Sequence, residues 1–181
     1  LVEALLDFQF EVLTTYFNEG NRKPERSSYN NAHAYLSAPY GIYKTSNGYI
    51  AIAMTPLPQL GELLDLNSIK DLHDQKEWFT KRDEIKKDIG DWIEKQTTEH
   101  WLSILEPADI WCAKVLDWET MVKHEGFKIL DMVQRIKRDD GLDIETLRCP
   151  IKIDGEIFKS SKAAPKIGND NNSIMKEFGI S

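Results

Sequence analysis

The side chains best suited to catalysis in this sequence, its four histidines and two cysteines, are scattered along the chain. No histidine has a second metal ligand three or four residues away on a predicted helix, so their spacing indicates no metal site. Cys112 lies in an apolar run without a neighbouring base, which favours a buried, unreactive thiol over a nucleophile. Cys149 directly precedes Pro150 and is interpreted in the same way. The histidines are His33, His73, His100 and His124.

Short motifs for phosphate, dinucleotide or hydrolase chemistry are also absent from the sequence. It contains no glycine-rich phosphate loop, no dinucleotide fingerprint, no metalloprotease helix motif and no serine in a Gly-x-Ser-x-Gly turn. The charged clusters Glu94-Lys95 and Asp139-Asp140 are interpreted as solvated faces and turns. The residues by themselves therefore predict a fold class but no catalytic residue and no metal.

Length and composition predict one folded domain with an apolar core. The chain has 181 residues, of which 41% are hydrophobic and 29% are charged, as is typical of globular proteins. The net charge of -7, with lysine and arginine interleaved among acids, argues against a nucleic acid partner. No apolar stretch is long enough to span a bilayer, so no membrane partner is expected. Two cysteines without redox or metal spacing fit a reduced, cytoplasmic setting.

Two β-hairpins give the clearest local signals. Strand-like runs at 40–45 and 49–54 flank Ser46-Asn47-Gly48, and Asn-Gly tolerates the positive φ angles of tight hairpin turns. A second pair of runs, 132–137 and 142–147, flanks Asp139-Asp140-Gly141. Both hairpins are predicted to be antiparallel.

Helical periodicity and capping residues define the other elements. Thr80 is expected to cap one helix, Thr97 or Thr98 the next, and Asp117 a third. We expect helices over 58–64, 80–93, 97–105, 117–122 and 174–178, and strands over 110–116 and 151–153.

The first 20 residues predict a single helix that is apolar nearly all round. Leu5, Leu6 and Leu13 recur at helical spacing, while Phe8 and Phe10 lie on the other side. Such a helix must be buried from several directions, although chain termini are usually exposed. We therefore expect covering structure outside this chain, either an N-terminal half, a separate subunit or a dimer partner.

The sum of these elements is an α/β protein in which helices and strands are mixed and the hairpins are antiparallel. We divide the chain into a buried helix, a linker, a small α+β domain and a C-terminal return segment. The four ranges are 1–20, 21–37, 38–117 and 118–181.

The order of several segments resembles family III coenzyme A transferases, the group that includes formyl-CoA transferases, carnitine CoA-transferases and 2-methylacyl-CoA racemases. Segment 38–53, APYGIYKTSNGYIAIA, resembles the hairpin that opens the small domain of that family. Segment 105–115, LEPADIWCAKV, is similar to the family's Gly-Ile-Pro-Cys-Ala-Pro-Val stretch. Similar matches continue in the helix pair at 80–85 and 97–101, the late hairpin from 132, and the closing segments 150–153 and 164–168.

The resemblance implies an enzyme that moves coenzyme A between carboxylic acids, with coenzyme A as substrate and no cofactor. In the family an aspartate attacks the acyl-CoA thioester, through anhydride and enzyme-thioester intermediates, and this aspartate lies upstream of the matching segment. The resemblance thus implies that this chain alone is inactive. It also implies acyl-CoA and a carboxylic acid as ligands and an interlocked homodimer.

Several departures from the family pattern separate the alternatives. Thr55-Pro56-Leu57-Pro58 lacks the glutamate that racemases of the family carry nearby, and 34–37 lacks the glycine-rich loop of formyl-CoA transferases. A transferase of another specificity is therefore favoured, with a racemase or a non-catalytic subunit as alternatives. The loops around the first hairpin are expected to wall the acyl pocket. The candidate residues are Ala38, Pro39, Tyr40 and Met54.

Overall fold

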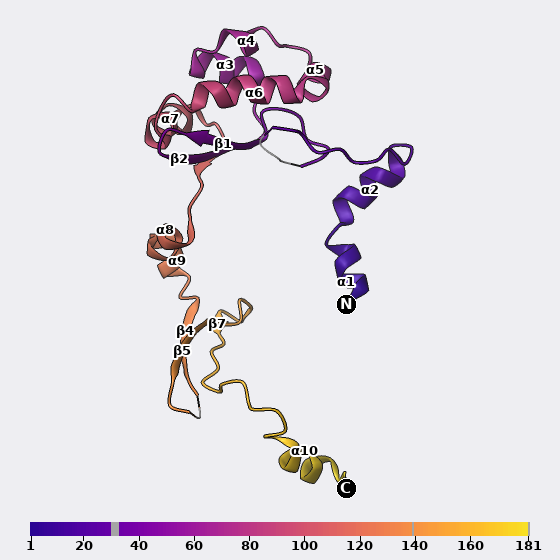
Figure 1. The fold of residues 1–181 in the computed structure, drawn as a ribbon, viewed down its shortest axis with the longest axis vertical. Coiled ribbons are helices and arrows are strands. Elements are labelled where there is room, and N and C mark those ends of the chain that lie inside the picture. Colours follow the sequence, from indigo (N-terminus) through magenta and orange to yellow (C-terminus); the bar gives the residue numbers. More distant parts are fainter. Residues whose placement is uncertain (30–32, 139, 181) are drawn as a thin grey trace. The chain divides into compact units, whose positions relative to one another are not determined.

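The computed structural model describes residues 1–29, 33–138 and 140–180. The chain divides into two compact units, Leu1–Leu116 and Asp117–Ser181, each built from helices and antiparallel strands (Figure 1). The mixed α/β class with antiparallel hairpins, expected from the sequence, is confirmed.

The first unit contains a three-stranded antiparallel sheet in the order β1-β2-β3, with β2 in the centre. Helix and strand bounds in this unit are α1 Val2–Asp7, α2 Phe10–Asn18, β1 Gly41–Thr45, β2 Gly48–Ile52, α3 Leu57–Leu64, α4 Asn67–Lys70, α5 Gln75–Thr80, α6 Arg82–Ile93, α7 Thr98–Leu105 and β3 Cys112–Lys114. A 3₁₀ turn at Glu106–Ala108 follows α7. The expected strand 110–116 is therefore shorter than its apolar run.

One face of this sheet packs on helices and forms the core. Tyr43, Ile50 and Ile52 point into it and are fully or almost fully buried. Helix α6 runs along this face beside β1 (Figure 1), and contributes Ile85 and Ile89 to the same core. Because strand side chains alternate, the residues between them point to the opposite face, which the helices leave open.

The first hairpin is present, but its turn differs from the expected geometry. Thr45 pairs with Gly48, so the loop consists of Ser46 and Asn47, and neither Asn47 nor Gly48 has a positive φ. The turn is held by the Asn47 side chain rather than by a residue with positive φ. Its Oδ1 accepts a hydrogen bond from the Thr98 backbone N–H at 2.8 Å, which ties the turn to the start of α7.

Two capping predictions are confirmed and one is wrong. Thr97 accepts a hydrogen bond from the His100 N–H, and Asp117 accepts one from the Thr120 N–H. Thr80 caps nothing, because it is the last residue of α5, and α6 begins at Arg82 without a side-chain cap.

The N-terminal segment forms two helices rather than the predicted single one. Helix α1 ends at Asp7 and α2 begins at Phe10, and neither helix contains a buried residue. Most of its apolar side chains are exposed, with Phe8 at 93% and Leu1 at 98%, while Val12, Leu13 and Tyr16 are half-buried. An apolar surface of this size usually marks a contact region.

The second unit contains short helices and two separate hairpins. Its elements are α8 Trp118–Lys123, α9 Glu125–Ile129, β4 Val133–Lys137, β5 Asp143–Leu147, β6 Lys152–Ile153, β7 Glu156–Ile157 and α10 Asn171–Phe178. The hairpin β4-β5 confirms the second sequence prediction. The hairpin β6-β7 extends the predicted strand at 151–153 by a partner that the sequence pattern did not indicate. Within the described residues, no helix combines the length and apolar character needed to cross a membrane.

Candidate functional site

The open face of the three-stranded sheet forms a trough with alanines along its floor. Ile42 pairs with Ala51 and Ala51 pairs with Ala113, so these three side chains make one row across the face. Two residues further along the same strands, Ala53 and Trp111 are joined by a 2.8 Å backbone hydrogen bond. The small side chains of Ala51, Ala53 and Ala113 lie between the larger Ile42 and Trp111 and leave a hollow.

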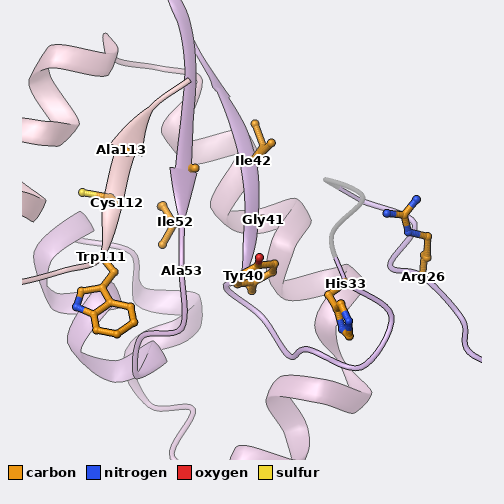
Figure 2. A pocket seen from close by; sticks show the side chains of 11 residues that line it. Arg26, His33, Tyr40, Gly41, Ile42, Ile52, Ala53, Trp111, Cys112 and Ala113 are labelled. Carbon is orange, nitrogen blue, oxygen red and sulfur yellow. The ribbon is translucent and has the colours of Figure 1, made fainter. Parts of the chain in front are cut away.

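This hollow is a pocket of about 780 Å³, within the size range of sites that hold small molecules and cofactors. Figure 2 shows Trp111 and Cys112 at one end and His33 and Arg26 at the other, with Tyr40 between them. The lining is mostly apolar.

Few groups in the pocket can exchange protons or attack a substrate. Burial raises the pKa of the Cys112 thiol, with a further contribution from Glu106, so the thiolate is disfavoured. His33 is the single imidazole among the described lining residues, and its Nε2 lies 3.7 Å from the Glu11 carboxylate. The described residues hold no cluster of three or more metal-ligating side chains. This set can bind and orient a ligand, but it contains no placed nucleophile with its base.

The four predicted site residues occupy different environments. Tyr40 lines the pocket, whereas Ala38 belongs to the hydrophobic core behind the sheet. Pro39 is buried, and its carbonyl accepts a 2.6 Å hydrogen bond from the Tyr43 hydroxyl. Met54 follows the central strand, is 61% exposed and lies outside the pocket lining. Their role in acyl binding stays a prediction, with Tyr40 alone in the pocket lining.

The Tyr43 hydroxyl links the core to the rim of the pocket. Its side chain is fully buried, and burial raises the pKa of the phenol well above its usual range, so it is a permanent donor. The acceptor is the carbonyl of Pro39, the residue before Tyr40. This hydrogen bond therefore fixes the backbone directly before Tyr40. The Ala38-Pro39 peptide bond is cis.

Two adjacent residues at the start of α6 fix the linker that carries Arg26 and His33. The Arg82 guanidinium donates hydrogen bonds to the carbonyls of Glu25, at 2.6 Å, and Ala34, at 2.8 Å. One side chain therefore joins the two ends of the segment 25–34. We call this pair of residues, Arg82 and Asp83, the linker clamp.

Asp83 supplies the other half of the linker clamp. Its Oδ1 accepts hydrogen bonds from the Ser27 hydroxyl, at 2.7 Å, and the Ser28 N–H, at 2.8 Å. Burial alone would raise the pKa of Asp83, but these hydrogen bonds and the nearby Arg82 lower it. Ser27 is almost fully buried, so the residue next to Arg26 is anchored.

Sequence reasoning missed most of the pocket. It assigned both Arg26 and His33 to the linker 21–37, because no local pattern shows that Arg82 holds Glu25 and Ala34. The alanines at 51, 53 and 113 did carry a usable signal. Ala51 lies between the buried Ile50 and Ile52 of the central strand. A small residue on the open strand face leaves room for another group to pack there.

The fold and pocket together define an α/β protein with a mostly apolar pocket on the open face of a small sheet. A comparison with family models matches CoA-transferase family III over residues 1–171. The chain therefore belongs to CoA-transferase family III, as its segment order suggested.

Known relatives agree with this assignment. The human alpha-methylacyl-CoA racemase is 25% identical over 148 residues, which cover 78% of this chain and 37% of the racemase. A CAIB/BAIF family protein from Brucella suis has a similar structure, with a TM-score of 0.60 and 20% identity. The protein Rv3272 of Mycobacterium tuberculosis gives a TM-score of 0.64 at 17% identity.

The coverage of these structures is uneven. The Brucella match covers 91% of this chain but 43% of that one, and the Mycobacterium match covers 92% and 44%. This chain thus spans less than half the length of the relatives that it matches. At these identities the two structures establish the fold.

Proposed function

We propose that this chain forms one wall of the acyl-CoA site in a CoA-transferase that moves coenzyme A between carboxylic acids. The observation that carries the proposal is the apolar trough on the small-domain sheet of a family III chain. Its floor of alanines accommodates an alkyl chain, and Tyr40 and Trp111 at its edges supply apolar contact area. Coenzyme A enters as a substrate, and no cofactor is required.

The reacting carboxylate belongs, in this proposal, to polypeptide outside residues 1–181. The described pocket lining contains no Asp or Glu, so it offers no acyl acceptor of the kind that an aspartyl-CoA route needs. The chain binds and shields the acyl group while an aspartate on the remaining structure forms the covalent intermediate. By itself the chain is then inactive, and a homodimer in the cytoplasm is the expected working form.

A racemase is the second candidate, favoured by the similarity to the human racemase. Racemisation at the carbon next to a thioester requires an acid and a base on opposite sides of that carbon. The described lining offers His33 for such a role but no carboxylate, and the raised pKa of Cys112 disfavours its thiolate. The sequence 54–58 also lacks a carboxylate. The transferase therefore ranks first.

One reaction in D2O separates the candidates. The natural protein that carries this chain is incubated with a 2-methylacyl-CoA and a second, isotopically labelled carboxylic acid, and the products are analysed by mass spectrometry. A transferase yields the labelled acid as its CoA thioester without deuterium at the α-carbon. A racemase yields deuterated 2-methylacyl-CoA without the labelled thioester. Neither product would contradict both candidates.

A further inference from the structure

The central strand β2 and the residue after it carry three side chains on the open face of the sheet, and these differ in size. Tyr49, Ala51 and Ala53 alternate with the buried Ile50 and Ile52, so all three point to this face. Ala51 and Ala53 line the pocket, whereas Tyr49 lies outside its lining. Along this strand the pocket therefore stops where the small side chains end and an aromatic ring begins.

Larger side chains also flank Tyr49 on both neighbouring strands. Lys44 pairs with Tyr49 in the β1-β2 register, and the Glu94 carboxylate holds its ammonium group at 2.5 Å. On the other side, the Val115 backbone N–H donates a hydrogen bond to the Tyr49 carbonyl at 3.0 Å, so Val115 continues this row beyond β3. The row lies directly beside the alanine row of the pocket floor and forms a step of larger side chains.

The direction across the sheet, towards the linker, is less favourable for an alkyl chain. The pocket lining at that end consists of Tyr40, His33 and Arg26, which carry polar groups (Figure 2). An alkyl chain there would remove these groups from water without offering them hydrogen bonds. The alanines of the central strand offer apolar surface instead, in the direction of Tyr49.

We infer that Tyr49 is a specificity-determining residue that limits the length of the acyl group held in the trough. This inference rests on the proposed function and narrows its substrate to alkanoyl groups of limited length. The alkyl chain lies over Ala53 and Ala51 with its end against the Tyr49 ring. Longer alkyl groups must leave the trough at this point, so their additional methylene groups stay in water.

Non-reactive ligands test the inference on the natural protein that carries this chain. Coenzyme A thioethers, from S-propyl to S-decyl, lack the thioester carbonyl and therefore report binding without CoA transfer. Isothermal titration calorimetry gives the affinity at each chain length. We expect the affinity to rise about fourfold with each methylene group that enters the trough, and to level off at the length that reaches Tyr49.

Tyr49→Ala should move this plateau to longer chains. It removes the ring and extends the alanine floor by two strand residues, about 7 Å, so the affinity should keep rising for at least about two further methylene groups. Tyr49→Val makes a similar truncation with a residue that favours strands, and should shift the plateau in the same direction. Tyr49→Phe is the matched control, because it keeps the ring and should leave the plateau at its wild-type length.

Ala51→Leu tests the same floor in the opposite direction. The larger side chain fills the space in front of Tyr49, so the plateau should move to shorter chains. Thermal unfolding without ligand shows whether each variant is folded, and two truncations of Tyr49 guard against the loss of one of them.

Two results would overturn the inference: a plateau that stays at the wild-type length when the Tyr49 ring is removed, or affinities that do not depend on alkyl length. A plateau displaced equally by Tyr49→Phe would also overturn it, since the ring would then not be the limit. The thioether affinities do not depend on turnover. Absence of both CoA transfer and α-proton exchange would sink the proposed function with the chain-length profile intact, whereas an unmoved plateau would sink this inference and leave the transfer reaction standing.

Discussion

Tyr43 connects the hydrophobic core to the rim of the pocket, and its hydrogen bond contributes to the stability of the fold. Its hydroxyl donates a hydrogen bond to the Pro39 carbonyl, and the side chain is fully buried. We predict that Tyr43→Phe lowers the free energy of unfolding by about 1–2 kcal/mol, because a buried carbonyl loses its partner. Urea denaturation measures the change.

Tyr49→Phe provides the matched control for Tyr43→Phe. Tyr49 lies on the same hairpin with its side chain 49% exposed, so water replaces whatever its hydroxyl loses. A change below about 0.5 kcal/mol is expected there, as for most surface substitutions. Equal effects at the two positions would show that the Pro39 hydrogen bond does not stabilise the fold.

Lys86 is a buried cation in α6, away from the pocket. Burial, with a contribution from Arg82, lowers the pKa of its amine from 10.5 to about 8, and Asp83 opposes the shift. The folded state therefore disfavours the charged amine, and this cost is full below pH 8 and fades as the pH rises towards 10.5.

We predict that the wild-type protein gains stability relative to Lys86→Met as the pH increases from 8 to 10.5. Thermal unfolding of both proteins across this range measures the difference, in which the titrations of all other groups cancel. A difference in Tm that stays constant over the range would contradict the lowered pKa.

At the scale of elements, Gly61 sets the approach of α3 to α4. A Cβ atom at this position would lie 2.9 Å from the Lys70 backbone nitrogen and 3.0 Å from Ile69 Cγ1. We predict that Gly61→Ala destabilises the protein by about 1–3 kcal/mol, because backbone atoms must move to relieve the overlap.

Gln59→Ala on the exposed side of α3 is the control for Gly61→Ala, since both substitutions place alanine in the same helix. Chemical denaturation should show a change near zero for this variant. A stabilised Gly61→Ala protein would mean that helix propensity outweighs the close contact with α4.

The first hairpin is joined to α7 by a network around Glu99. Hydrogen bonds from Lys114 Nζ and Asn47 Nδ2, both 2.7 Å long, lower the pKa of the Glu99 carboxyl from 4.5 to about 2. A lowered carboxyl pKa contributes stability that is full above pH 4.5 and is lost as the pH falls towards 2.

We predict that Glu99→Gln lowers Tm near neutral pH and that the gap to wild type narrows below pH 4.5. Thermal melts between pH 7 and pH 3 measure the gap, and Glu84→Gln controls for the removal of a surface acid. A gap that widens on acidification would contradict the network.

The elements show why some parts of the fold were predictable. The hairpins and the caps at Thr97 and Asp117 depend on a few adjacent residues, so local patterns predicted them. The positions of Glu25 and Ala34 depend on Arg82, some 50 residues away in the chain, and no local pattern reveals such contacts. Arg26 follows Glu25, one of these anchored residues, which explains why the sequence located Tyr40 in the pocket lining but not Arg26.

The predicted N-terminal helix failed for a related reason. Periodicity favours one helix over the first 20 residues, but α1 and α2 contain no buried residue that would hold it together. Short helices depend on tertiary packing for most of their stability. The expectation that other structure covers this segment stays a prediction.

At the scale of the whole molecule, the described residues combine an apolar pocket with extensive exposed apolar surface, and the described pocket lining holds no nucleophile with a neighbouring base. Exposed groups include Phe8 and Phe10 in the first unit and Trp118, at 81% exposure, in the second. The chain also spans less than half of its structural relatives. The proposed function assigns acyl binding to this chain and the reacting carboxylate to another part of the enzyme, and it rests on these features.

Peptide mapping of the covalent intermediate tests this division most directly. The natural protein is quenched during turnover with an acyl-CoA, and mass spectrometry locates the acyl or CoA adduct. We predict an adduct on an aspartate outside residues 1–181 and none within them. An adduct on Cys112, or on any other residue of this chain, would contradict the account.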